Sequence, residues 1–570
     1  MSKNKRLCPR SQFQGTDFCT PHRVIKLKFQ NNSGASLRVI REHRTSASSE
    51  QLGNDQKFWE GLHLLRLRDG LRESDFGTSK SYHSGLVILF TPNLLPWFKN
   101  DAFIPKILKQ LGKKNPDDLA EHPLVYDVLY ACVDGIAPRG NFGTHHGKRV
   151  TEGFSFLHVP ASRLLESDAL SSSASEVKES WNTTVPSAIT FASGEDAPFK
   201  VTVPLANTLF QNGKPSLLVS SRWKEKDNKF LEIIPRTEEH TATVNTFVHV
   251  KDAPFSFIPA QSVTPFRTIV TGLGNIIRTL DFGKGDVGPA SRELEAVVSQ
   301  ISERLGGSTV DVWALILPPG VVNAVAENTV EHGPEYVGFW LNKGATMCRV
   351  VSGGGGWGPK QGLLSLDPQT ENEMSSGPGS GSLEEQKISA LGNLAQTGAS
   401  IQFLVMDNNL EPPPPPIYAD RYMSWKTTVF GTIPSTIDDI PKLSTSSNPT
   451  RYRFLQGHFG CVSGSGIFYY QEGLETEEKP NPEGEERAEE SIKSKEISNA
   501  RRQARLPMTR TKIDLPSSYV YMDSRIAARR KGTTPKQAGY TRRSAKRILR
   551  GDPVKVRTFE KDFVVTKVYE

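Results

Sequence analysis

Apolar residues recur along this chain in short runs whose spacing favours β-strands over helices. Residues 85–90 and 124–133 are nearly uninterrupted apolar stretches of the length expected for buried strands. Shorter strand-like pieces follow one another at residues 188–191, 199–203, 217–219, 230–234 and 243–250. The same pattern returns across residues 452–470. We therefore expect a body built mainly of β-strands.

Two segments show the spacing of amphipathic helices. One begins near residue 101 and places its large apolar side chains on a single face. The other covers residues 291–305, where apolar residues recur every three or four positions before a pair of glycines stops the helix. An extended segment at residues 268–271 precedes this second helix, and a buried strand is expected at residues 310–317. This order predicts a local α/β unit.

Two pairs of extended segments flank turn-forming residues and predict β-hairpins. Residues 24–29 alternate between apolar and polar positions, and an extended pattern resumes at residues 37–40 after a turn rich in Asn, Ser and Gly. Residues 336–341 and 345–351 flank an Asn-Lys-Gly turn in the same way. We expect each pair to form two neighbouring antiparallel strands.

Composition divides the chain into four segments. We expect a basic disordered start or presequence at residues 1–20, a β-rich domain at 21–260 and an α/β-like domain with a glycine-rich loop at 261–470. Residues 471–570 have the composition of a disordered tail, acidic first and basic afterwards, with extended structure returning only at 554–568. The expected fold class is α+β: a β-rich mixed body with a local α/β unit, followed by that tail.

Several classes of protein are excluded by what the chain lacks. No apolar run approaches the roughly 20 residues that a helix needs to cross a bilayer, so no integral membrane segment is expected. The five cysteines are too few and too scattered for a disulfide framework, which favours a reducing compartment. They also lack the short spacing of metal ligands, so no metal site is expected. No nucleophile and base can be paired from spacing alone, so a catalytic residue and a cofactor stay unknown.

Charge is distributed unevenly along the chain, whose formal net charge is +8. Residues 1–48 carry +8, residues 49–471 carry −7 and residues 472–490, with nine Glu, carry −7. Residues 491–557 then carry +15. A long basic extension gains affinity for phosphate polymers by releasing their condensed counterions, so RNA or a ribonucleoprotein is the expected partner. The glutamate-rich stretch could shield the basic one when no ligand is bound.

The basic segment contains two clusters that are candidate nucleic-acid-binding residues. The clusters comprise Arg529, Arg530, Lys531, Arg542, Arg543, Lys546 and Arg547. Their cationic groups would pair with RNA phosphates, and Tyr540 between them could stack on a base. The same spacing matches a bipartite nuclear-import signal. The sequence leaves both interpretations open.

A glycine-rich string follows the extended segment that ends at residue 351. Its candidate phosphate-binding residues are Gly353, Gly354, Gly355, Gly356, Gly358 and Lys360. Glycines let backbone amides approach an anion closely, and a lysine would neutralise its charge. The string departs from a P-loop because Pro359 stands at the lysine position and no Ser or Thr follows. A mobile lid or a close-packed turn is the competing interpretation.

Four strings carry a resemblance to other sequences: residues 20–27 (TPHRVIKL), 31–36 (NNSGAS), 91–98 (TPNLLPWF) and 353–368. In these strings the chain resembles a family of uncharacterised predicted proteins from filamentous ascomycete fungi, over the part that ends near residue 470. The resemblance implies no activity, cofactor or site residue. The functional interpretation therefore depends on the residues themselves.

The leading interpretation is a non-enzymatic RNA- or ribonucleoprotein-associated factor that acts in mitochondrial gene expression. The compartment is suggested by a basic start with no acid before Asp17. One alternative is an enzyme that binds a nucleotide or a phosphorylated metabolite at residues 353–360. The other is a nuclear ribosome-biogenesis or chromatin factor, in which the basic clusters serve nuclear import.

Overall fold

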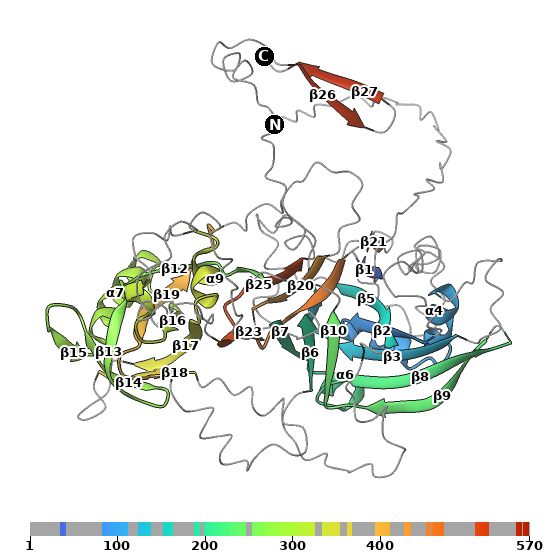
Figure 1. Cartoon of the computed structure of the whole chain (residues 1–570), viewed down its shortest axis with the longest axis horizontal. Helices are drawn as coiled ribbons and strands as arrows, with labels where there is room; N and C mark the ends of the chain where they lie inside the picture. Colours follow the sequence, from blue (N-terminus) through green and yellow to red (C-terminus); the bar gives the residue numbers. More distant parts are fainter. Residues whose placement is uncertain are drawn as a thin grey trace, which may run out of the picture.

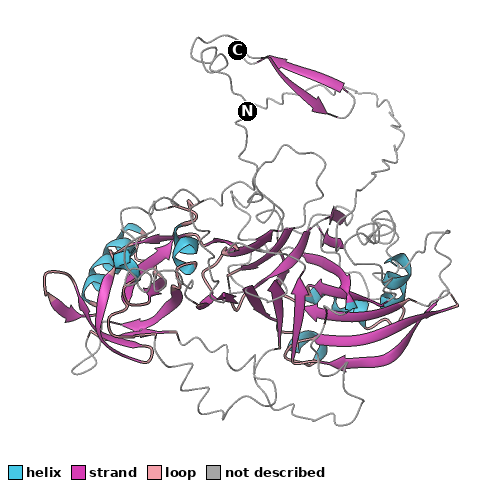
Figure 2. Cartoon of the chain, in the orientation of Figure 1, coloured by secondary structure: helices cyan, strands magenta, loops and turns pink. Residues whose placement is uncertain are grey.

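Strands dominate the computed structural model of the chain, and helices are few (Figures 1 and 2), which confirms the α+β class. The structure describes residues 35–41, 83–111, 124–137, 152–161, 164, 187–193, 199–227, 229–246, 254–324, 333–353, 362–367, 394–410, 427–434, 452–456, 458–471, 508–523, 555–560 and 563–568. Within these ranges, the strands form four large sheets and one two-stranded sheet.

Sheet 1 has seven strands and includes the two long apolar runs of the sequence as parallel neighbours. In spatial order its strands are β21 (Tyr452–Gln456), β1 (Ala35–Arg41), β5 (Glu152–Pro160), β2 (His83–Phe90), β3 (Val125–Cys132), β8 (Leu218–Lys226) and β9 (Lys229–Glu238). Both faces of the sheet are buried at β2 and β3, which is why these strands read as continuous apolar runs rather than as alternating ones.

One face of sheet 1 is covered by short helices. They are η2 (Pro92–Leu94), α3 (Leu95–Phe98) and α4 (Phe103–Leu111), the last of which confirms the helix expected near residue 101. Trp97 is fully buried between the helices and the sheet, with its ring centroid 5.3 Å from that of Phe103 and 5.4 Å from that of Phe154. Such aromatic packing fixes the helices on the sheet.

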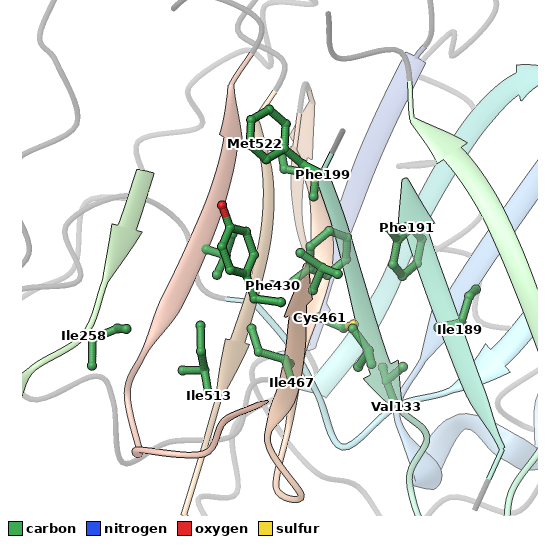
Figure 3. Packing of buried hydrophobic residues seen from close by; sticks show 14 of the residues in the cluster. Val133, Ile189, Phe191, Phe199, Ile258, Phe430, Cys461, Ile467, Ile513 and Met522 are labelled. Atoms are coloured by element: carbon green, nitrogen blue, oxygen red, sulfur yellow. The ribbon is translucent and has the colours of Figure 1, made fainter. Parts of the chain in front are cut away.

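Two five-stranded sheets pack against the other face of sheet 1. Sheet 2 contains, in order, β10 (Thr241–Thr246), β6 (Ala188–Ser193), β7 (Phe199–Pro204), β23 (Ile467–Gln471) and β24 (Thr509–Ile513). Sheet 3 contains β11 (Phe255–Phe257), β25 (Tyr519–Asp523), β20 (Thr427–Thr432), β22 (His458–Ser463) and β4 (Gly135–Ile136). Side chains from both sheets meet in one apolar core (Figure 3), where the Phe191 and Phe430 rings stack 4.5 Å apart.

Sheet 4 closes on itself through six antiparallel strands, because β19 pairs with both β13 and β16. Its strands are β12 (Ala260–Ser262), β13 (Arg267–Leu273), β14 (Ile276–Asp281), β15 (Val287–Pro289), β16 (Val312–Leu317), β17 (Thr346–Gly353), β18 (Leu364–Leu366) and β19 (Ser400–Met406). The strand β16 is buried on both faces. Val312, Ala314 and Ile316 point into the core of this sheet. Trp313, Leu315 and Leu317 point into the core shared with sheets 1 to 3.

The local α/β unit expected from the sequence lies in sheet 4. Helix α7 (Arg292–Arg304) connects the first strands of the sheet to β16, and it coincides with the predicted helix. Both β13 and β16 run antiparallel to β19, so they are parallel to each other with one strand between them. Arg267 on β13 holds the helix in place because its guanidinium donates to both carboxylate oxygens of Glu293, at 2.9 and 3.0 Å.

The hairpin expected at residues 336–351 is wrong, because its first half is helix α9 (Tyr336–Leu341). Tyr336, Val337, Trp340 and Leu341 are all buried, at the spacing of one helical face, and they pack into the shared core. A six-residue apolar run fits a strand and a buried helix equally well, so the sequence pattern alone did not distinguish them. The second half is β17 as expected.

Two further short helices are α6 (Leu209–Asn212) and α8 (Val321–Ala324).

The hairpin expected near the start of the chain is replaced by another pairing. Residues 37–40 are extended, as predicted, within β1, but β1 pairs with β5 and β21. Residues 24–29 lie outside the described ranges. The partner β21 is more than 400 positions away in the chain, and no local pattern signals such a pairing.

Two strands of the body come from the segment assigned to the disordered tail. Both β24 and β25 lie within residues 471–570, and Val520 and Met522 on β25 have no exposed surface. The expectation of disorder was wrong for residues 508–523, because composition averaged over a long charged segment hides short alternating strands. Since β23 pairs with β24, sheet 2 also joins residues from both sides of the boundary predicted at 470.

The last strands of the chain form a separate two-stranded sheet. They are β26 (Lys555–Glu560) and β27 (Phe563–Val568), which pair antiparallel within the segment expected to be extended. Among the residues that the structure describes, no helix is long and apolar enough to cross a membrane.

Candidate functional site

The seven basic residues that the sequence identified, from Arg529 to Arg547, lie outside the described residues. The structure does show the strand that precedes their segment in the chain. Residues 524 onward follow β25, which pairs antiparallel with β20 on one side and with β11 on the other. Because β25 is an interior strand of sheet 3 with a buried inner face, the basic segment begins at a fixed point on the folded body.

The strand before β25 is held in place by polar contacts with sheet 4. The Thr511 hydroxyl on β24 accepts from the Met347 backbone amide at 2.8 Å and donates to the Met347 carbonyl at 3.0 Å. The Trp313 indole N–H donates to Asp514 Oδ1 at 2.7 Å. Burial raises the pKa of Asp514, although this hydrogen bond opposes the shift. The strands that lead into the basic segment are therefore fixed to sheet 4 as well as to sheets 2 and 3.

The glutamate-rich stretch, residues 472–490, and the first part of the basic stretch, residues 491–507, together connect two neighbouring antiparallel strands. This connection leaves from β23 and returns at β24, where Gln471 lies directly opposite Thr509. The glutamate-rich stretch therefore follows β23 directly, and residues 508–523, which contain β24 and β25, separate the two parts of the basic stretch, 491–507 and 524–557. The strands β23, β24 and β25, which border these charged stretches in the chain, all contribute to one core, through Ile467, Ile513 and Met522 respectively (Figure 3).

The glycine-rich string connects β17 to β18, and the two described glycines at its ends are explained by packing. A Cβ on Gly353 would lie 2.2 Å from a Leu364 methyl on the paired strand. Gly362 has φ +81°, and a Cβ there would lie 2.5 Å from Pro289. Gly354, Gly355, Gly356, Gly358 and Lys360 lie outside the described residues, so phosphate binding by this string stays a prediction.

A charged cluster that the sequence did not reveal lies on sheet 1. Asp127 on β3 is buried and accepts hydrogen bonds from Arg222 on β8, with Nη2 to Oδ2 at 3.1 Å, while His83 Nε2 on β2 lies 2.9 Å from Oδ2. Burial acts to raise the pKa of Asp127, but the hydrogen bonds from His83 and Arg222 outweigh it and lower that pKa below its usual value. The three residues come from adjacent strands, which only the pairing of distant segments brings together.

Asp127→Asn is expected to lower the free energy of unfolding by about 3 kcal/mol at neutral pH, because it leaves Arg222 without its buried charged partner. Because the folded-state pKa is lowered, this contribution is present above about pH 4 and is lost as the pH falls through the folded-state value. Urea titrations at neutral and acidic pH measure both effects. Asp311→Asn is the control, since Asp311 pairs with Arg349 at an exposed site and should cost less than about 1 kcal/mol. Equal losses would contradict the account.

Features of a metal site or a reactive thiol are not found in the described part of the chain. There, no three His, Cys, Asp or Glu side chains gather as a metal ion would require. The three described cysteines, Cys132, Cys348 and Cys461, are buried and not in disulfides. Burial raises the pKa of Cys132 far above its usual value, so its thiol stays protonated at neutral pH.

Similarity to other proteins does not assign a function to the chain. No model of a known protein family, no curated protein and no solved structure matches it. The functional inference therefore depends on two properties of the chain itself. These are the distribution of its charge and the identity of the strands that border the charged segments in the chain.

Proposed function

We propose that the chain is a non-enzymatic RNA- or ribonucleoprotein-binding factor of mitochondrial gene expression, in which a folded β-rich body carries a basic segment that contacts phosphates. The observation that supports this most strongly is the placement of charge. Residues 524–553 contain ten Lys or Arg and a single acid, Asp552, and they directly follow the interior strand β25. A segment of this kind binds polyanions through counterion release.

Attachment to a folded body gives the basic segment a role that a free basic peptide lacks. A contact made by the body holds the RNA near the segment, and the second contact then forms at a high effective concentration. The body supplies selectivity in this arrangement, and the segment supplies phosphate contacts that carry little sequence information. The glutamate-rich residues 472–490 follow β23 of the same core and compete with RNA for the basic residues.

The salt dependence of RNA binding tests this proposal. A labelled single-stranded RNA is titrated with the whole chain at several salt concentrations, and binding is followed by fluorescence anisotropy. Each phosphate contact contributes about 0.7 to the slope of log affinity against log salt, so contacts from the seven basic residues predict a slope of about −5. A slope near zero, or no binding at low salt, would contradict the proposal.

A further inference from the structure

One face of the hairpin formed by β8 and β9 carries three lysines and a leucine. Lys226 lies opposite Lys229, and Lys224 lies opposite Leu231. Residues opposite each other on paired strands point to the same face, as do residues two positions apart on one strand. We name Lys224, Lys226, Lys229 and Leu231 the lysine face. The hairpin lies at one end of the molecule, at the right of Figure 1.

The lysine face is open to solvent, whereas the opposite face of the hairpin belongs to the core. Trp223 and Phe230 point to that opposite face and are buried between sheet 1 and its short helices. The three lysines are exposed, and Leu231 keeps 49% of its surface exposed. The neighbouring Ile233 is 49% exposed as well. The hairpin therefore presents positive charge and aliphatic surface side by side.

The charge of the lysine face is not neutralised by the body. None of the three lysine side chains has an ion-pair partner among the residues that the structure describes. Glu225 lies opposite the buried Phe230, which puts its carboxylate on the other face, and Glu232 lies there too, opposite Trp223. The third acid between residues 224 and 233 is Asp227, in the turn. An anionic partner would thus meet three lysines and no carboxylate on the strands of this face.

Strand addition at β9 is disfavoured, although β9 is an edge strand of sheet 1. The strand contains an extra residue, Ile233, where its register with β8 shifts. Two positions further, Pro235 has no backbone N–H to donate to another strand. Bulges and prolines protect edge strands from pairing with a second chain. The lysine face, rather than the strand edge, is therefore the surface on which a partner can dock.

The combination of lysines with aliphatic side chains favours a lipid surface over RNA. An RNA would pair with the lysines but would gain little from Leu231 and Ile233, because bases stack on aromatic rings. A bilayer with anionic headgroups uses both kinds of side chain. The ammonium groups contact the lipid phosphates while the aliphatic side chains enter the boundary between headgroups and acyl chains. Lysine suits this position because its stem lies along apolar surface while its charge stays in water.

We infer that the lysine face docks on an anionic lipid bilayer, with the three lysines at the headgroups and Leu231 inserted between them. The contact is peripheral and does not depend on the RNA binding proposed above. Each lysine close to such a surface strengthens binding by roughly fivefold, and an inserted aliphatic side chain adds to this.

Lysine footprinting of the unaltered full chain tests the inference. Exposed amines are acetylated briefly with and without vesicles, and mass spectrometry gives the rate of modification at each lysine. Phosphatidylcholine vesicles with about 30% phosphatidylglycerol should slow the three lysines of the face by at least about threefold. Vesicles of phosphatidylcholine alone should not. Three lysines exposed elsewhere on the body should keep their rates, namely Lys99, Lys109 and Lys284. Because each lysine is measured separately, vesicle contacts of the basic tail do not obscure the result.

A pair of leucine variants tests the inserted side chain. Leu231→Asp should weaken binding to the anionic vesicles by roughly 10-fold in sedimentation assays, because it removes apolar surface and adds a negative charge. Leu273→Asp is the matched control, since it makes the same change at a leucine on β13 that is 83% exposed. Both variants keep the basic tail, and the control should bind within about twofold of the wild type.

Three outcomes would decide against the inference. Equal slowing of the two sets of lysines, or equal losses from the two leucine variants, would overturn it. Slowing of the lysine face by single-stranded RNA but not by anionic vesicles would overturn it and assign the face to RNA. Absence of RNA binding by the full chain would overturn the proposed function and leave this inference standing.

Discussion

Replacing the seven basic residues of the two tail clusters with glutamine is expected to lower the affinity for single-stranded RNA on the order of 1,000-fold at about 100 mM salt. The substituted residues are Arg529, Arg530, Lys531, Arg542, Arg543, Lys546 and Arg547. Each contact that is lost removes the release of condensed counterions, so the slope of log affinity against log salt should flatten by up to about 5. Fluorescence anisotropy at several salt concentrations measures both quantities.

The matched control removes the same charge from the folded body. In this control variant, glutamine replaces seven of the exposed cations on the body, namely Lys99, Lys109, Lys224, Lys226, Lys229, Lys284 and Arg304. If binding depended only on net charge, this variant would lose as much affinity as the tail variant does. The proposal predicts a much smaller loss for the control, since these residues do not belong to the basic segment. Equal losses from the two variants would refute a dedicated role for the tail.

Gly460→Ala is expected to cost about 4 kcal/mol of the free energy of unfolding. Gly460 on β22 has φ +133°, and a Cβ there would lie 1.8 Å from the Val429 carbonyl oxygen on β20. The amide of Gly460 also donates to the buried Ser155 hydroxyl at 3.0 Å, so the strand cannot shift without losing that bond. Because β20 pairs with β25 on its other side, the substitution should also loosen the strand that carries the tail.

A second glycine separates crowding from backbone strain. Gly283 has φ +99°, but a Cβ there would have no atom within 4 Å. Gly283→Ala should therefore cost only about 1 kcal/mol, the price of the unfavourable φ. Urea titration of both variants gives the comparison. Losses of similar size at the two positions would show that the close approach of β22 and β20 is not as described.

Local patterns in the sequence predicted the elements whose signals lie within one segment. The apolar runs of β2 and β3, and the helical spacing of α4 and α7, are of this kind, because burial of one element fixes its own periodicity. The prediction of a strand at residues 336–341, where the structure has helix α9, was also wrong for a local reason. A run of six apolar residues fits a strand and a buried helix equally well.

Long-range pairing could not be predicted in this way. Asp127 and Arg222 meet because β3 pairs with β8, and the two residues lie 95 positions apart. Tyr470 and Lys200 lie opposite each other in the same manner, because β23 pairs with β7. The strand β24 was hidden for a different reason: its Thr-Arg-Thr-Lys-Ile sequence alternates as a strand should, but it lies within a long charged stretch.

The most direct test of the central claim is crosslinking and recovery of RNA from cells that produce the whole chain or a chain ending at Asp523. Ending the chain at Gln471 instead would remove β24 and β25 from the core and confuse loss of the tail with loss of the fold. The account predicts that the whole chain recovers mitochondrial transcripts or ribosomal RNA and that the shortened chain recovers much less. Recovery of no RNA above background by either chain would contradict it.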